Sequence, residues 1–307
     1  MIAAIDLGGT RIKYGLVVDG QVVASAHCPA DAQGKLEEQL DAVLQHLGVL
    51  CKQQGTTLEL CQGIGILCTG LVNNREMVVL STNGKYEAAV GFNFCEWAEE
   101  RVGLPLRMEN DARGALIGEW RYGAGRGVDD LVMVTLGTGV GTAVILGGKP
   151  LTGTHFSSGI LGGHILVHSG GRQCTCGAFG CLESEASGWV LPELVSSHEL
   201  YLKSSLRGLE SVGFHELMDH ASRGDACACA VQEHCFRLWG EALVSYLHLY
   251  APQRIVVGGG VMNSAELILK SFRQTVAKYA WGHLGQVDIV AAQHPNNAGL
   301  IGAAALF

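Results

Sequence analysis

The order of predicted secondary structure elements occurs twice along this chain. An apolar strand at residues 2–5 leads into a glycine turn, into further strands, and then into helices that alternate with strands up to a helix after Asp111. From residue 131 the chain again runs strand, glycine turn and strand, continues through helices and two more strands, and ends in a helix. Two copies of one unit predict an α/β fold with two similar lobes and a cleft between them, where a ligand would bind.

Composition excludes several other classes of protein. The 307 residues are 48% hydrophobic and only 16% charged, which is typical of a compact globular chain and not of a disordered one. The net charge is −8 and no block of Lys or Arg occurs, so no nucleic-acid partner is expected. Residues 131–148 carry no charge, but their glycines and threonines predict two buried strands instead of a membrane helix, and no membrane partner is expected.

The N-terminal residues and the cysteines indicate a cytoplasmic protein. Met1 is followed almost at once by an acid, Asp6, without the basic and apolar regions of a secretory signal. The eleven cysteines are an odd number, and six of them have no close partner in sequence, which is typical of reduced thiols in a cytosol.

Three glycine clusters follow predicted strands. Residues 8–10 (Gly-Gly-Thr) follow the first strand, residues 137–139 (Gly-Thr-Gly) take the equivalent place in the second repeat, and residues 258–260 are three glycines at the end of a later strand. Backbone N–H groups in such turns form a concave site for an anion, so we interpret the first two clusters as phosphate loops, with a plain glycine hairpin as the alternative for the first. The second cluster imitates a dinucleotide-binding fingerprint, but a strand follows it where that motif requires a helix. The third cluster can lie flat against a nucleotide base or ribose.

Asp111 stands in the motif Glu109-Asn110-Asp111, directly after a predicted strand and before a helix. An aspartate in that place can simply be the N-cap of the helix. In a chain with two phosphate loops, the tip of a strand is also where a general base would lie to take a proton from an acceptor hydroxyl. We therefore predict that Asp111 is the catalytic base.

A candidate zinc site lies in residues 163–183. One imidazole and three thiols, the donor set of a closed tetrahedral zinc site, come from His164, Cys174, Cys176 and Cys181. Buried thiols or a disulfide are the alternatives. His168 would share a strand face with His164 and is therefore an alternative ligand.

These motifs, in this order, resemble the ROK family of sugar kinases and related repressors. The resemblance rests on residues 6–15, 65–70, 109–112, 136–141, 164–183 and 257–260. It implies the actin-like ATPase (ribonuclease H-like) fold. It also implies an ATP-dependent kinase that phosphorylates a hydroxyl, the C6 hydroxyl, of a hexose or N-acetylhexosamine, and that forms a homodimer.

The domains implied are an N-terminal lobe at residues 1–115, which the C-terminal helix at about residues 293–307 rejoins, and a C-terminal lobe at residues 116–292 with the zinc loop.

The resemblance also assigns roles to individual residues. Asp111 matches the base that takes the proton of the sugar hydroxyl, and Asp6 matches the residue that holds Mg2+ through water. The sugar contacts are Asn83, Asn110, Asp111, His164 and Glu183. The residues matched to ATP are Asp6, Gly8, Gly9, Thr10, Lys13, Thr138, Gly139, Gly259 and Gly260. His164 is a zinc ligand in the same family, and Zn2+ would orient its ring so that the other nitrogen faces the sugar.

Leu161 departs from the family pattern, because many ROK sugar kinases have a Glu there, in a Gly-Glu-x-Gly-His segment. Leucine accepts no hydrogen bond from a hydroxyl, so the identity of the sugar stays open, and glucose is expected to bind poorly. The alternatives to a kinase are a sugar-binding regulator and a pseudokinase without turnover. Repressors of the family carry a DNA-binding domain ahead of the first phosphate loop, where this chain has only a few residues, so a kinase is favoured.

Overall fold

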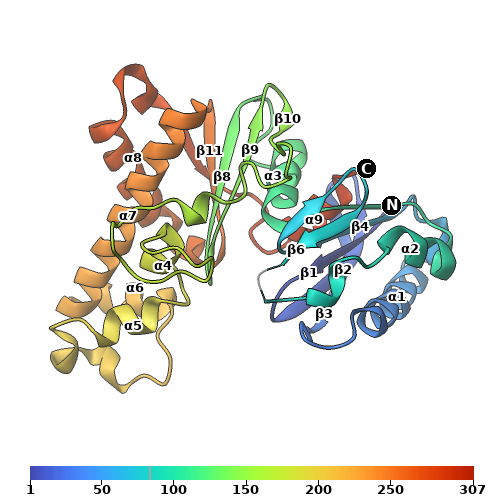
Figure 1. The fold of residues 1–307 in the computed structure, drawn as a ribbon, viewed down its shortest axis with the longest axis horizontal. Coiled ribbons are helices and arrows are strands. Elements are labelled where there is room, and N and C mark those ends of the chain that lie inside the picture. Colours follow the sequence, from blue (N-terminus) through green and yellow to red (C-terminus); the bar gives the residue numbers. More distant parts are fainter. Residues whose placement is uncertain (83) are drawn as a thin grey trace. The chain divides into compact units, whose positions relative to one another are not determined.

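The computed structural model describes residues 1–82 and 84–307, which form two compact units (Figure 1). Unit 1 consists of Met1–Gly127, Pro150–Ile160 and Gln293–Phe307, and unit 2 of Val128–Lys149 and Leu161–Ala292. Each unit contains a five-stranded sheet, in the order β3-β2-β1-β4-β7 in unit 1 and β10-β9-β8-β11-β12 in unit 2. The element order predicted as a repeat is therefore present as two sheets of the same strand order.

The sheet of unit 1 consists of β1 (Ile2–Leu7), β2 (Arg11–Val18), β3 (Gln21–Pro29), β4 (Ile64–Cys68) and β7 (Leu106–Asn110). β1 pairs antiparallel with β2 and parallel with β4, which is itself parallel to β7. A separate hairpin is formed by β5 (Leu71–Asn73) and β6 (Val78–Ser81).

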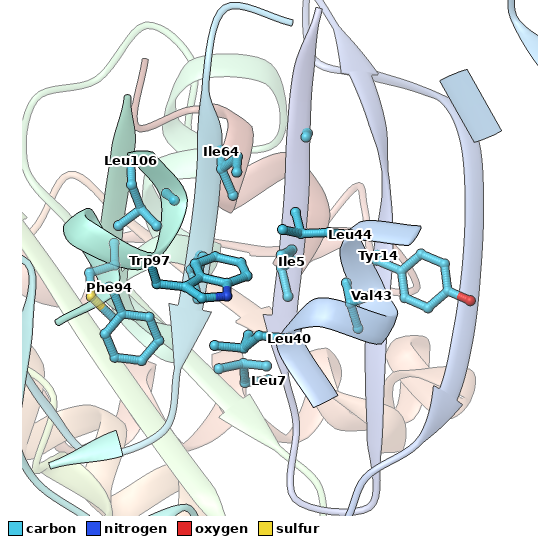
Figure 2. Packing of buried hydrophobic residues seen from close by; sticks show 14 of the residues in the cluster. Ile5, Leu7, Tyr14, Leu40, Val43, Leu44, Ile64, Phe94, Trp97 and Leu106 are labelled. Carbon is cyan, nitrogen blue, oxygen red and sulfur yellow. The ribbon is translucent and has the colours of Figure 1, made fainter. Parts of the chain in front are cut away.

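Helices cover both faces of this sheet. Successive residues of β1 alternate between the two faces. Ile5 and Leu7 belong to one hydrophobic cluster with α1 (Leu36–Gln53) and α2 (Phe94–Val102). Figure 2 shows side chains of α1, such as Leu40, beside these two residues of β1. Ile2 and Ala4 belong to a second cluster with α9 (Ala298–Ala304).

Glycines allow α9 to approach its neighbours closely. Helix α3 (Asp111–Tyr122) packs on α9, and a Cβ at Gly118 would lie only 2.9 Å from the backbone nitrogen of Gly302. Since real Cβ atoms do not approach backbone this closely, larger residues would push the two helices apart. The chain has 43 glycines in 307 residues, and this helix crossing explains part of that content.

The sheet of unit 2 consists of β8 (Leu131–Leu136), β9 (Val140–Leu146), β10 (Lys149–Pro150), β11 (Arg254–Gly258) and β12 (Asp288–Ala291). Its helices are α4 (Leu182–Ala186), α5 (Leu191–Ser196), α6 (Phe214–Ser222), α7 (Ala226–Tyr250) and α8 (Ala265–Tyr279). Trp239 of α7 packs against aromatic rings of α6 and α8, and its indole N–H donates to the carbonyl of Ala186 (2.7 Å). The uncharged residues 131–148 contain β8 and β9, as predicted, and among the described residues no helix is both long and apolar enough to span a membrane.

The division into units differs from the predicted boundary between residues 115 and 116. That boundary would cut α3, which is continuous to Tyr122 and packs on α9 within unit 1. Residues 150–160 also belong to unit 1, because the guanidinium of Arg113 donates hydrogen bonds to the carbonyls of Phe156 (2.9 Å) and Ser158 (3.2 Å). Sequence order alone does not reveal such a return of the chain.

Candidate functional site

The carboxyl ends of three parallel strands bring the predicted residues of unit 1 together. In the register of the sheet, Leu7 of β1 lies beside Cys68 of β4, and Cys68 lies beside Asn110 of β7. Gly8 and Asp111 follow directly after β1 and β7, so the first glycine loop and the predicted base leave the sheet at the same edge. In α/β proteins, ligands bind at this edge of the parallel strands.

Asn110, and not Asp111, is the N-cap of α3. The Oδ1 of Asn110 accepts a hydrogen bond from the backbone N–H of Arg113 (3.1 Å), whereas Asp111 is the first helical residue. The interpretation of Asp111 as a helix cap is therefore wrong. Asp111 Oδ1 accepts hydrogen bonds from Asn110 Nδ2 (2.9 Å) and from the N–H of Ala112 (2.8 Å), and Asn110 Nδ2 also donates to the carbonyl of Gly70 (3.0 Å). These contacts fix the orientation of the carboxylate.

The carboxyl groups of Asp6 and Asp111 both have raised pKa values, and the charge of Asp111 acts on Asp6. Burial raises the pKa of Asp111 above its usual range, although hydrogen bonds from Ala112 and Asn110 and the charge of Lys85 lower it. Burial also raises the pKa of Asp6 to about 6, and the negative charge of Asp111 adds to this effect while Lys13 opposes it. A divalent cation would relieve the repulsion between two such carboxylates, so Asp6 fits a role in holding hydrated Mg2+.

Residues of α9 and of the segment before it complete the surroundings of Asp6. Lys13 lies opposite Asp6 in the register of β1 and β2, and its Nζ donates a hydrogen bond to the carbonyl of Asn296 (3.2 Å). Gly299 packs directly against the Asp6 carboxylate, where any side chain would overlap with it. The sequence analysis missed both Asn296 and Gly299, because nothing in the chain marks a contact across almost 300 residues.

The first glycine loop is held at both ends. The N–H of Gly8 donates to the carbonyl of Asp6 (3.0 Å), and the hydroxyl of Tyr86 donates to the carbonyl of Gly8 (3.0 Å). After Gly9, the carbonyl of Thr10 accepts a hydrogen bond from the N–H of Ala30 (3.1 Å). The loop is therefore pinned by its neighbours in both directions along the chain.

A buried ion pair supports the strand end that carries Asp111. Arg113 and Glu109 are both fully buried, and Arg113 Nη1 lies 2.6 Å from Glu109 Oε1. The same oxygen accepts the backbone N–H of Asn110 (2.8 Å), and Glu109 Oε2 accepts a hydrogen bond from Asn74 Nδ2 (2.5 Å). The spacing of Glu109 and Arg113 is visible in the sequence, but their burial is not, and the sequence analysis assigned them no role.

The segment between β6 and α2 contains one predicted site residue, Asn83, and one residue that was not predicted, Lys85. The predicted sugar contact Asn83 lies outside the described residues. Lys85 lies across the first glycine loop, because a Cβ at Gly9 would be 2.9 Å from the Lys85 Nζ. No motif in the sequence points to Lys85.

In unit 2, Thr138 and Gly139 lie in the turn between β8 and β9. Glu183 Oε2 accepts a hydrogen bond from the N–H of Val140 (2.9 Å) and lies 2.5 Å from the position that a Cβ would take at Gly139. Glu183, predicted as a sugar contact, is therefore in contact with the second glycine loop.

The third glycine cluster lies next to that loop. β11 is parallel to β8, so its terminal glycines follow the same edge of the sheet as Gly137. A Cβ at Gly137 would lie 3.8 Å from the nitrogen of Gly260. Gly259 has a φ of +95°, and a side chain there would overlap with the carbonyl of Leu136. Bare backbone from both clusters is thus gathered at one edge, as contact with a nucleotide requires.

The four predicted zinc ligands form one cluster. The ligand atoms of His164, Cys174, Cys176 and Cys181 all lie within 4.8 Å of one another. Cys174 Sγ is 3.4 Å from His164 Nδ1, and Cys176 Sγ is 3.6 Å from Cys181 Sγ. Ligands at ~2.0–2.3 Å around a tetrahedral zinc ion are about 3.5 Å apart, so this donor set fits zinc. The three thiols are free, so the disulfide alternative is wrong.

His168 lies outside this cluster. Its Nδ1 is 3.1 Å from Glu185 Oε2, and His164 lies in a 3-10 turn (Gly162–His164) instead of a strand. The expected strand face shared by the two histidines is therefore wrong. Glu185 is fully buried and also contacts Arg172 Nη1 (3.2 Å). Through these two contacts, Glu185 of α4 holds residues 168 and 172, which precede Cys174.

Leu161 immediately precedes the turn that carries His164. Its side chain is 47% exposed, although leucine is apolar. The next residue is fixed on both sides, because the N–H of Gly162 donates to Thr142 Oγ1 (2.8 Å) and its carbonyl accepts from the hydroxyl of Tyr246 (2.8 Å). An exposed leucine on such a fixed turn is available to a ligand.

Comparison with known proteins gives consistent matches over the whole chain. The model of the ROK family matches residues 2–307. A glucokinase of Thermotoga maritima is 28% identical, over 99% of this chain and 96% of that protein. The solved structure of a ROK family glucokinase from Streptomyces griseus in complex with glucose and AMPPNP has a TM-score of 0.80 and 30% identity, covering 99% of this chain and 98% of that one. The solved structure of a ROK family transcriptional regulator, described as a homolog of the E. coli MLC protein, has a TM-score of 0.87 and 25% identity. The match covers 99% of this chain and 77% of the regulator's chain. These matches confirm the predicted actin-like ATPase fold.

Proposed function

The chain belongs to the ROK family, and on that premise we propose that it is an ATP-dependent sugar kinase that transfers the γ-phosphate of ATP to the C6 hydroxyl of a hexose or N-acetylhexosamine. The observation that carries the proposal is the placement of Asp111. Its carboxylate is oriented by Asn110 and Ala112, its pKa is raised by burial, and it lies at the same sheet edge as the first glycine loop. Binding of a sugar alone requires no such base.

In the proposed reaction, Asp111 takes the proton of the sugar hydroxyl. The hydroxyl oxygen forms a bond to the γ-phosphorus, and the bond between that phosphorus and the β–γ bridging oxygen breaks, so that ADP leaves. Asn110, His164 and Glu183 hold sugar hydroxyls, and we assign the same role to Asn83. Because little covalent chemistry falls to the protein in phosphoryl transfer, positioning of this kind supplies much of the rate.

The glycine clusters provide the nucleotide contacts in this proposal. Gly8, Gly9, Thr10 and Lys13 hold phosphate oxygens from unit 1, Thr138 and Gly139 do so from unit 2, and Gly259 and Gly260 contact the adenosine. Asp6 holds Mg2+ through water. When bound, Mg2+ neutralises charge on the phosphates.

The cluster of His164, Cys174, Cys176 and Cys181 would hold Zn2+, whose part is structural. Once bound, it would fasten the loop before α4, and the Nε2 of His164 would remain for the sugar, since Nδ1 faces Cys174. The family resemblance also leads us to expect a homodimer, which sedimentation analysis would test.

Sugar-dependent release of ADP tests the proposal. The purified chain would be assayed with ATP and Mg2+ on glucose, mannose, N-acetylglucosamine and N-acetylmannosamine, with reactions lacking sugar or Mg2+ as controls. We expect ADP release with at least one sugar and a 6-phosphate as the product. The similarity to a ROK transcriptional regulator favours a second candidate, a sugar-responsive regulator. Sugar binding without any sugar-dependent ADP release would support that candidate and contradict the kinase.

A further inference from the structure

Lys85 is a cation placed on the first glycine loop. A Cβ at Gly9 would lie 2.8 Å from the Lys85 Cδ and 2.9 Å from its Nζ, so the side chain crosses Gly9 in contact with the backbone. Only a glycine leaves room for this arrangement. The ammonium group therefore lies beside the backbone of Gly9, and ammonium groups and backbone N–H groups are both donors to an anion.

The position of Lys85 is fixed by its neighbour in sequence. Tyr86 is almost completely buried, donates from its hydroxyl to the carbonyl of Gly8 (3.0 Å), and donates from its N–H to the carbonyl of Ala32 (2.8 Å). Tyr86 also has a φ of +56°, a left-handed conformation that is rare for a tyrosine. Strained backbone of this kind occurs mainly where a functional arrangement requires it. Here it directs the preceding residue over the loop.

Within residues 1–82 and 84–307, the ammonium group of Lys85 forms no ion pair. The carboxylate nearest to it in sequence, Glu87, is engaged by the hydroxyl of Thr82 (2.5 Å) and the N–H of Gly84 (3.0 Å). The positive charge of Lys85 also favours the negative form of Asp111 and so lowers the pKa of that carboxyl group. A cation without an ion pair in the described part of the chain thus lies against the first glycine loop, and its charge favours the negative form of Asp111.

We propose that Lys85 binds the phosphoryl group during its transfer from ATP, an inference that rests on the proposed function. As the sugar oxygen bonds to the γ-phosphorus and the bond to the β–γ bridging oxygen breaks, the proton of the sugar hydroxyl passes to Asp111 and the electron pair of the broken bond leaves with ADP. Lys85 keeps its proton and donates hydrogen bonds to the non-bridging oxygens of the moving group. Negative charge that is spread over these oxygens in the transition state is what a placed cation stabilises.

Titrations with two nucleotides test this role without turnover. Lys85→Ala is expected to weaken the binding of Mg2+-AMPPNP about tenfold and to leave Mg2+-ADP within about twofold, because only the first has a γ-phosphate. In steady-state assays, kcat should fall about 100-fold while KM for the sugar changes little, and Lys85→Arg should recover part of kcat. Lys52→Ala is the matched control, since Lys52 is an exposed lysine in the last turn of α1 and lies in none of these contacts.

Three results would overturn the inference. Equal losses for ADP and AMPPNP would place Lys85 away from the γ-phosphate. Tighter nucleotide binding in Lys85→Ala would mean that the side chain obstructs the loop. A raised KM for the sugar with unchanged nucleotide affinity would assign Lys85 to the sugar. If Lys85→Ala weakens the binding of AMPPNP and not that of ADP, in a protein whose wild type phosphorylates no sugar, the role of Lys85 in binding the γ-phosphate stands, and only the proposed function fails. Because Lys85 is exposed, an unchanged melting temperature should accompany each variant.

Discussion

At the scale of single residues, Asp6 links the stability of the protein to pH. Its pKa is raised from 3.8 to about 6, so the folded state binds this proton more tightly than the unfolded state does. Stability therefore falls as pH rises from about 4 to 6, where the unfolded chain is already ionised. A shift of about two units corresponds to about 3 kcal/mol, and Asp6→Asn should raise the free energy of unfolding by about 2 kcal/mol at pH 7.

Urea denaturation without Mg2+ measures this difference, and at pH 4 most of it should disappear. The variant should also need more Mg2+ for activity. An Asp6→Asn protein that is less stable than the wild type at pH 7 would contradict the assignment of a buried, repelled carboxylate to this position.

Leu161 governs the choice of sugar in this account. Leu161→Glu places a hydrogen-bond acceptor where many ROK sugar kinases are expected to have one, so kcat/KM on glucose should rise about tenfold, the equivalent of one added hydrogen bond. Leu166→Glu is the control, since Leu166 is also an exposed leucine in the same segment of unit 2. If the wild type already uses glucose as well as any other sugar and Leu161→Glu changes nothing, Leu161 does not face the sugar.

At the scale of elements, the loop before α4 depends on its metal. We expect one zinc ion per chain by elemental analysis, and its removal by a chelator should lower both the melting temperature and the affinity for sugar, because Glu183 follows the last ligand by two residues. Cys176→Ser should have the same effects. Cys229→Ser should have neither, although Cys229 is exposed like Cys176, because its thiol lies on α7 against the carbonyl of Ala221. Full activity in protein without zinc would contradict the proposed structural role of the metal.

The pair of Glu109 and Arg113 joins β7, α3 and residues 150–160. Arg113→Met leaves a buried carboxylate without its partner, so it should cost about 3 kcal/mol of stability and also lower kcat, because the backbone of Asn110 is held by the same oxygen. Replacing both residues, with Glu109→Leu added, should recover part of the stability. Denaturant titration of the two single variants and the double variant measures the coupling, and strictly additive effects would show that the pair does not act as a unit.

At the scale of the whole molecule, the sequence predicted those features of the fold and the site that depend on local sequence patterns. Apolar runs and glycine turns indicated the two repeated sheets. The position of Asp111 directly after a strand predicted that it lies at the tip of that strand, where it shares a sheet edge with the first glycine loop. These features depend on residues close together in the chain. The spacing of the thiols with His164 likewise predicted a cluster that the structure contains.

The parts that sequence did not predict depend on contacts between distant segments. Gly299 against Asp6, Lys85 over Gly9 and the return of residues 150–160 to unit 1 each join positions that no local pattern relates. His164 was expected on a strand, where it would share a face with His168, but it ends a 3-10 turn that begins at Gly162. Here glycine flexibility and a hydrogen bond to Thr142 override the local pattern.

The most direct measurement of the central claim compares Asp111→Asn with the wild type on the sugar that supports ADP release. Asparagine keeps the shape and hydrogen bonds of the side chain but cannot take a proton, so kcat should fall by about 100-fold or more, while the dissociation constant of the sugar, measured by calorimetry, stays within about threefold. Asp219→Asn, at a partly exposed aspartate on α6, should leave both values unchanged. Turnover close to that of the wild type in Asp111→Asn would contradict the account, because the base would then be another group.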